Sequence, residues 1–134
     1  MFVDASAIVA ILTRESGFES LNVALEGATA LHTSAVAIFE ATLGVRRKRR
    51  CDVAQAQQVV MAFLAALRID VAIIAAAEAS GALDAFSRFG KGTGHPAQLN
   101  MGDCFAYAVA RSIGASVLFT GDDFARTDIS GPPD

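Results

Sequence analysis

The sequence predicts an α/β domain of three layers, α/β/α, with a mainly parallel central sheet. Short apolar segments that suit strands alternate with longer segments that suit helices, which is typical of βαβ units. With 134 residues and 13.9 kDa the chain has the length of one domain, and 53% hydrophobic residues suffice for its core. We therefore expect a single domain over residues 1–134, of which about 130–134 form a flexible tail.

The N-terminal half is predicted to contain two strands, each followed by helices. Asp4 ends the first strand, and Ser6 and Ser34 are placed to act as N-caps. The predicted elements are a strand at 2–3, helices at 7–12 and 17–28, a strand at 30–33 and a helix from 35 to about 50.

The helix from Ala35 to about Arg50 is expected to bury one face. Val36, Phe39 and Leu43 share a face by their spacing of three and four residues. Because Glu40 lies one turn after Val36, it should lean toward that buried side.

The C-terminal half is predicted to add three helices and two strands. They are a helix from near 52, a strand at 69–72, helices at 74–89 and 101–113, and a strand at 116–120, with loops at 90–96 and 121–123. The first of these helices has the clearest amphipathic pattern, at Val59, Val60, Phe63, Leu64 and Leu67. Asn100 is placed to cap the helix at 101–113, with Asp103 in its first turn.

Four acidic residues are predicted to meet at the carboxyl end of the sheet, where ligands bind in open parallel sheets. They are Asp4, Glu40, Asp103 and Asp122. Two carboxylates about 5 Å apart repel by about 3 kcal/mol at an effective dielectric near 20, so four together require protons or a cation. Mg²⁺ prefers such oxygen ligands, and it suits metal-assisted hydrolysis of a phosphodiester.

Each acid on its own has a simpler interpretation. Asp103 suits a first helical turn with Asn100 as its cap, and Glu40 suits a solvated helix face. Asp122 and Asp123 suit a turn. Asp4 suits the polar end of a strand, but its apolar surroundings leave a charge there in need of a partner. The joint pattern favours one shared site.

Four segments of the chain, each with its acids, form a familiar series. They are Met1-Phe2-Val3-Asp4-Ala5-Ser6-Ala7, Ile38-Phe39-Glu40-Ala41, residues 95–108 around Asp103, and Leu118-Phe119-Thr120-Gly121-Asp122-Asp123-Phe124. Together they resemble the PIN-domain ribonucleases, specifically the VapC-type toxins of type II toxin–antitoxin pairs, over nearly the whole chain. The resemblance implies a toxic Mg²⁺-dependent endoribonuclease that uses a metal-activated water, with Mn²⁺ as an alternative ion. It also implies a cognate VapB-like antitoxin and a homodimer.

The same resemblance implies roles for individual residues. The positions that match Asp4, Glu40, Asp103 and Asp122 form the catalytic metal site. Ser6 supports the first aspartate, and Asn100 and Asp123 are further supporting residues. Asp122 is preferred to Asp123 as the fourth acid because it lies two residues after Thr120, in the family's Thr-x-Asp spacing. Asp128 is a distant third choice.

One strong run of basic residues is predicted to contact the RNA backbone. It consists of Arg46, Arg47, Lys48, Arg49 and Arg50. Glu40 and Arg47 lie seven residues apart on one predicted helix, hence on similar faces about 10 Å apart. The alternative is that these cations only stabilise the helix C-terminus and keep the chain in solution.

Composition excludes several other classes of protein. The net charge of −3 argues against coating nucleic acid by bulk charge, and Cys51 and Cys104 lack the spacing of a zinc or disulfide framework. The longest apolar run, at 59–67, is too short to cross a bilayer, and no basic leader precedes it, so we expect a cytoplasmic protein. Two other functions stay open. One is a haloacid-dehalogenase-like phosphatase, which would need an acid where Ser6 stands; the other is a non-catalytic interaction module.

Overall fold

The computed structural model describes residues 1–129 and 131, and it confirms the predicted α/β class. Its elements are β1 (Phe2–Val3), α1 (Ala5–Leu12), α2 (Phe18–Gly27), β2 (His32–Ser34), α3 (Ala35–Arg49), α4 (Val53–Ala66), β3 (Asp70–Ala72), α5 (Ala76–Phe89), α6 (Met101–Ser112), β4 (Val117–Leu118) and the 3-10 helix η1 (Phe124–Arg126). Of the predicted tail at 130–134, all but Gly131 lies outside the described residues.

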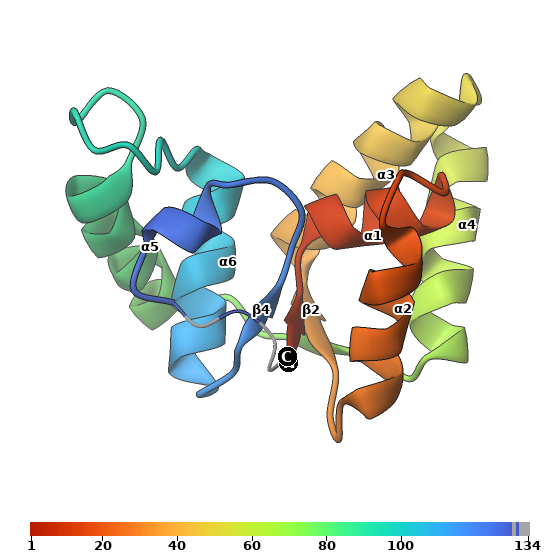
Figure 1. Ribbon diagram of the computed structural model, residues 1–134, viewed down its shortest axis with the longest axis horizontal. Helices are drawn as coiled ribbons and strands as arrows, with labels where there is room; N and C mark the ends of the chain where they lie inside the picture. Colours follow the sequence, from red (N-terminus) through yellow and green to blue (C-terminus); the bar gives the residue numbers. More distant parts are fainter. Residues whose placement is uncertain (130, 132–134) are drawn as a thin grey trace.

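The four strands form one parallel sheet in the order β3-β2-β1-β4. The chain moves from β1 outward to β2 and β3 and then crosses back to place β4 on the other side of β1. As a result α5 and α6 lie on one side of the strands and α1, α2, α3 and α4 on the other (Figure 1). The order of the strands reverses between β1 and β4, and this kind of position is where open α/β sheets bind ligands.

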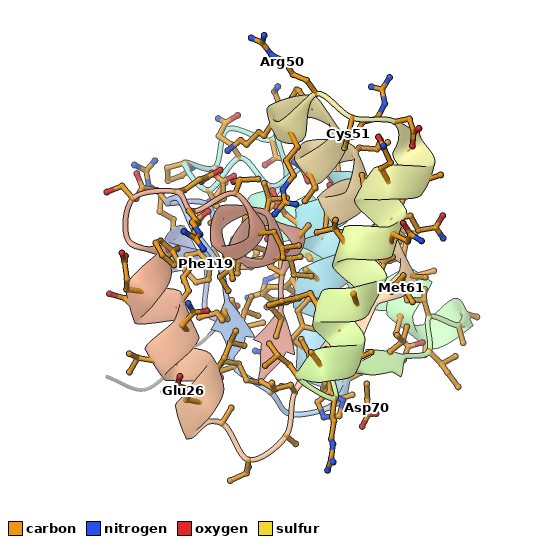
Figure 2. The ribbon with its side chains drawn as sticks, turned by 90° about the vertical axis from the view of Figure 1, so that its right-hand side faces the viewer. Glu26, Arg50, Cys51, Met61, Asp70 and Phe119 are labelled. Carbon is orange, nitrogen blue, oxygen red and sulfur yellow. The ribbon has the colours of Figure 1, made fainter. Side chains whose placement is uncertain are left out.

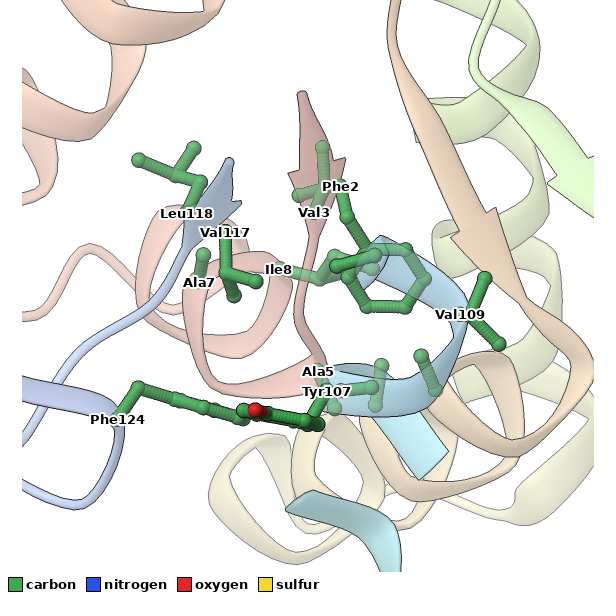
Figure 3. Packing of buried hydrophobic residues seen from close by; sticks show 14 of the residues in the cluster. Phe2, Val3, Ala5, Ala7, Ile8, Tyr107, Val109, Val117, Leu118 and Phe124 are labelled. Carbon is green, nitrogen blue, oxygen red and sulfur yellow. The ribbon is translucent and has the colours of Figure 1, made fainter. Parts of the chain in front are cut away.

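The core surrounds the short strand β1, whose two residues are completely buried on opposite faces of the sheet. Phe2 of β1 belongs to one hydrophobic cluster with Ile8 of α1 and Val109 of α6 (Figure 3). Full burial of such a side chain contributes about 1.5–3 kcal/mol. Packing of both side chains therefore adds to the backbone pairing with β2 and β4 that holds this short strand.

The prediction for the buried face of α3 was wrong. Phe39 is 66% exposed and Leu43 is 41% exposed. The face that packs inward is made of small residues, Ala37, Ala41, Thr42, Gly44 and Val45. α1 lies so close that a Cβ at Gly44 would be 2.7 Å from Cγ2 of Val9, which explains why small side chains face inward.

The predicted N-cap of α1 was also wrong, whereas the cap of α3 was correct. Ser34 Oγ accepts a hydrogen bond from the Ala37 N–H at the start of α3. At α1 the cap is Asp4, and Ser6 lies inside the helix. The helix therefore begins directly at the end of β1, which brings Asp4 and Ser6 to the carboxyl edge of the sheet.

The two cysteines are both free, as expected. Cys51 lies at the junction between α3 and α4 (Figure 2), and Cys104 is buried. Among the described residues, no helix combines the length and the apolar character needed to cross a membrane.

Candidate active site

Asp4 is the innermost acid of the site. It is 4% exposed, and its backbone N–H donates to the Leu118 carbonyl at 3.0 Å, which ties the end of β1 to the end of β4. Its Oδ2 accepts hydrogen bonds from the N–H of Ser6 at 3.0 Å and from the Ser6 hydroxyl at 2.6 Å. The carboxylate is thus fixed by the first turn of α1.

Ser6 joins the two strands that flank the switch point of the sheet. While its hydroxyl donates to Asp4, its Oγ accepts the backbone N–H of Thr120 at 3.1 Å. Thr120 lies just after β4, so Ser6 connects the first acid to the loop that carries the last ones. Through these two contacts Ser6 touches both the first acid and the segment after β4.

Asp103 and Asn100 form a reciprocal capping box at the start of α6. Asn100 Oδ1 accepts the N–H of Asp103 at 2.9 Å, and Asp103 Oδ2 accepts the N–H of Asn100 at 3.1 Å. The simple interpretation of Asp103 as a helix-capping residue is therefore correct, and it does not exclude a role in the site. The cap holds this carboxylate beside the end of β1.

Glu40 projects toward α6 from the second turn of α3. Its side chain lines the same cavity as Asp4 and Asp103, and a Cβ atom at Gly102 of α6 would overlap its carboxylate. The residue is partly buried, as predicted, although not through the face of Val36, Phe39 and Leu43.

The loop after β4 contributes Asp123 to the cavity and not Asp122. Asp123 is among the residues that line it, together with its buried neighbour Phe124. The Phe124 ring packs against Phe119 with 5.2 Å between the ring centroids, and this anchor sets the direction of the residue before it. Asp122, the preferred fourth acid of the sequence, is not among the lining residues, although both aspartates are exposed in the turn.

Four carboxylates consequently share one cavity of about 240 Å³ at the switch point. Its lining residues are Asp4, Ala5, Ser6, Glu40, Asn100, Asp103, Thr120, Asp123 and Phe124. No lysine or arginine is among these described residues, so no side chain of opposite charge balances the acids there.

Burial and the neighbouring charges raise the pKa values of three of these acids. Burial, followed by the charges of Asp4 and Asp103, raises the pKa of Glu40 to about 7. Burial also raises the pKa of Asp103 to about 6; the hydrogen bond from Asn100 opposes that rise and the charges of Asp4 and Asp123 add to it. Burial raises the pKa of Asp4 despite its hydrogen bonds from Ser6. A cation would relieve this repulsion.

The donor set suits a hard divalent ion that retains part of its water shell. In the described part of the chain, no group of three or more His, Cys, Asp and Glu side chains is arranged so that it could hold a metal ion directly. Mg²⁺ usually binds through one or two carboxylates and keeps several waters. At about 30 Å³ per water, the cavity has room for an ion and waters between it and the other acids.

A second hollow, of about 270 Å³, adjoins the acidic cavity and leads to the basic end of α3. The two share Ala5, Ser6, Glu40 and Thr120, and the second hollow is also lined by Val9, Glu15, Gly44, Arg47 and Lys48. The predicted neighbourhood of Glu40 and Arg47 is therefore present, because both residues line this second hollow.

The five basic residues differ in their surroundings. Lys48 forms an ion pair with Glu15, and Arg49 donates to the Leu12 carbonyl at 2.5 Å. Arg50 is the C-cap of α3 in the left-handed region, with φ 52°, and points away from the molecule (Figure 2). Arg46 is exposed. Among these residues, Arg47 combines a place in the hollow with no ion pair to any described residue.

Comparisons with known proteins identify the family of the chain. A sequence model of the PIN domain family matches residues 1–130. The chain belongs to the PIN-domain family. It is 42% identical to a VapC ribonuclease of Rhizobium meliloti, with 96% of this chain and 98% of the relative covered. It is 40% identical to ribonuclease VapC42 of Mycobacterium tuberculosis, with 96% of each covered.

A solved structure shows the same fold as this PIN domain. VapC20 of Mycobacterium tuberculosis, described as a toxin that cleaves the sarcin-ricin loop, superposes with a TM-score of 0.74 at 18% identity, with 96% of this chain and 95% of that chain covered. The predicted resemblance to VapC-type PIN domains is confirmed, and relatives named ribonucleases indicate a nuclease. The phosphatase alternative is not favoured.

Sequence reasoning missed two features of this PIN domain. One is the backbone N–H of Thr120, which the pattern could not reveal because it acts through the main chain. The other is Gly102, which lies between Met101 and Asp103 and gives Glu40 room to approach α6. A glycine in the first turn of a helix is an unfavourable choice for helix stability, and this was the available signal.

Proposed function

We propose that this PIN domain is a Mg²⁺-dependent endoribonuclease, the toxin of a toxin–antitoxin pair, which a cognate VapB-like antitoxin restrains. The observation that carries the proposal is the convergence of four carboxylates from four segments on one cavity without a basic side chain among its described lining. A bound cation would offset the repulsion among these acids, and relatives of this family are named ribonucleases, which supports the proposal.

The residues that would hold the ion, one or two directly and the others through its waters, are Asp4, Glu40, Asp103 and Asp123, so the fourth position moves by one residue from Asp122. When bound, Mg²⁺ polarises the phosphate of the substrate and offsets the charge that develops in the transition state. Mn²⁺, with similar oxygen preference, is the alternative ion. Asp122 is left as an outer residue of the turn.

The protein groups fix the geometry of the site in advance. Asp4 and Asp103 are held by the backbone hydrogen bonds that their carboxylates accept at helix N-termini, and Ser6 holds the segment after β4 against α1. The Ser6 hydroxyl donates a hydrogen bond to Asp4 and accepts one from the Thr120 N–H. It is therefore poorly placed to act as a nucleophile. Water is therefore the attacking group in this proposal.

RNA is proposed to lie across the two adjoining hollows, from the acidic cavity to Arg47. The guanidinium suits a phosphate oxygen by charge and by its fork of donors. Because Lys48 and Arg49 already have partners within the protein and Arg50 points away, Arg47 should contribute most of the contact. The predicted RNA-binding run is thereby reduced to one principal residue with four weaker neighbours.

The predicted homodimer and antitoxin are retained as proposed partners. Exposed apolar side chains, among them Leu83, Phe86 and Met101, border a hollow of about 310 Å³ between α5 and α6. Apolar surface gathered in this way typically marks a contact with another protein. Light scattering on the purified chain, alone and after co-expression with the antitoxin, would give both stoichiometries.

The decisive experiment is cleavage of total cellular RNA by the antitoxin-free protein in Mg²⁺, in Mn²⁺ and in EDTA. The Asp4→Asn and Asp103→Asn variants are assayed beside it, with circular dichroism as the check on folding. We expect discrete fragments that require both the metal and the two aspartates.

Equal cleavage by parent and variants at matched purity would contradict the proposal, since a contaminating nuclease would then account for the activity. Failure of the folded protein to cut RNA of its own host in either metal would also contradict it and would favour a non-catalytic interaction module.

A further inference from the structure

Gly102, the second residue of α6, lies directly behind the carboxylate of Glu40. A Cβ atom built on its backbone would overlap Oε1, Cδ and Oε2 of that side chain. The three overlapping atoms are the whole carboxylate group, so the contact is between the α6 backbone and the charged end of Glu40.

This environment differs from that of the other glycines, all of which the structure describes. Gly44 and Gly90 are close to Val9 and to Phe86, which are apolar packing partners. Several others, such as Gly27, have open space where a Cβ would be. Gly102 alone meets a carboxylate, and it does so at the acidic cavity.

We propose that Gly102 is a positioning residue for Glu40: the missing Cβ lets the carboxylate rest against the first turn of α6, beside Asp4 and Asp103. The proposal rests on the proposed metal-dependent function. Its consequence is that a glycine without any metal-binding group controls how many carboxylates face the cavity.

The backbone of Gly102 does not itself require glycine. Its φ is not in the left-handed region, and it lies within a helix, where alanine is the more favourable residue. The neighbouring group is the far end of a flexible side chain, which can rotate away from an added methyl. Gly102→Ala should therefore keep the fold and displace the Glu40 carboxylate.

The test measures Mn²⁺ binding to the purified, nuclease-competent full chain by electron paramagnetic resonance, without RNA. Gly102→Ala is compared with Gly27→Ala, a helical glycine with open space around it. We expect the Mn²⁺ dissociation constant to rise about 10–100-fold in Gly102→Ala, the usual effect of disturbing the support of a metal ligand, and to stay unchanged in Gly27→Ala.

A double-mutant cycle separates positioning from a general effect on α6. Glu40→Ala is combined with Gly102→Ala, and we expect the second substitution to add no further loss of Mn²⁺ affinity once the carboxylate is absent. A further loss of about 10-fold in the double variant would show that Gly102 acts on something other than Glu40, and would overturn the inference.

A metal-free crystal structure of Gly102→Ala provides the second readout. The inference predicts that the Glu40 carboxylate leaves its place against α6 while the α6 backbone stays where it is. An unmoved carboxylate, or a displaced helix with the carboxylate following it, would overturn the inference. Failure of the parent protein to bind Mn²⁺ would contradict the proposed function instead, and this structure would still decide the role of Gly102.

Discussion

The acids of the cavity are held in two different ways. Asp4 and Asp103 lie at helix N-termini, and each accepts a backbone hydrogen bond there. Asp123 instead belongs to an exposed turn in which its side chain makes no capping hydrogen bond. An acid that also caps a helix can be located from local sequence rules, whereas an acid in a turn takes its direction from the anchors on either side.

The turn has two such anchors. Before it, the Thr120 N–H is bound by Ser6; after it, Phe124 is buried. Further along, Asp128 accepts hydrogen bonds from Tyr107 and Arg88 and thereby ties the chain after β4 to α5 and α6. The comparison suggests that the turn, unlike the two capped acids, can be disturbed both at Asp123 itself and through its anchors.

Within the turn, the largest expected effect is at Asp123 itself. Asp123→Asn should lower metal-dependent RNA cleavage by at least about 100-fold, because it removes a carboxylate of the cavity and such a loss exceeds that of an outer residue. Asp122→Asn is the matched control and should change the rate little. The measurement is the initial rate of cleavage of one mapped RNA site at saturating Mg²⁺. If Asp122→Asn lowered the rate more than Asp123→Asn, Asp122 would be the fourth acid, in the Thr-x-Asp spacing.

Ser6→Ala should have the next largest effect, because Ser6 links Asp4 to the start of the turn. The loss of its hydroxyl releases both Asp4 and the Thr120 N–H, and the expected reduction in cleavage is about 10–100-fold. Ser16→Ala, an exposed serine in the turn between α1 and α2, is the control. If Ser6→Ala cleaved RNA as fast as Ser16→Ala, the link would have no functional role.

How far the sequence alone could predict the site follows from the same difference. The order of strands and helices was predictable because apolar segments of distinct length alternate, and Asn100 and Ser34 were recognisable as caps. The choice between Asp122 and Asp123 was not, since adjacent residues in a turn share all local features and only the burial of Phe124 separates them. The packed face of α3 was missed because glycine and alanine pack as closely as large residues when a partner helix approaches.

Asp128→Asn tests the more distant anchor and should have a smaller effect on cleavage. The substitution keeps the shape of the side chain but weakens the contacts to Arg88 and Arg111, so the turn should become looser and the rate should fall a few-fold. Asp84→Asn is the control, because Asp84 contacts the same Arg88 at 3.7 Å but lies outside the segment after β4. Exposed ion pairs of this kind contribute at most about 1 kcal/mol, so both variants should remain folded. Equal rates of cleavage in the two variants would mean that Asp128 does not help to position the turn.

The smallest expected effect concerns stability in the absence of metal. The folded-state pKa values of Glu40, about 7, and Asp103, about 6, are raised above those of an unfolded chain, near 4. Between about pH 4 and pH 7 the folded protein therefore binds more protons than the unfolded one, and its stability falls as pH rises through this window. In EDTA, the melting temperature should be a few degrees lower at pH 8 than at pH 5.

Glu40→Gln isolates the part of this pH dependence that comes from the cavity. The amide cannot ionise, so the melting temperature of the variant in EDTA should fall less between pH 5 and pH 8 than that of the parent. The effect of the substitution on the melting temperature should be largest near pH 8. Mg²⁺ should raise the melting temperature of the parent at pH 8 more than at pH 5, because the ion binds the ionised carboxylates and protons compete with it. Parallel pH curves for parent and variant would mean that the Glu40 carboxylate is as well solvated in the folded protein as in the unfolded chain, and the crowded cavity would then be open to water.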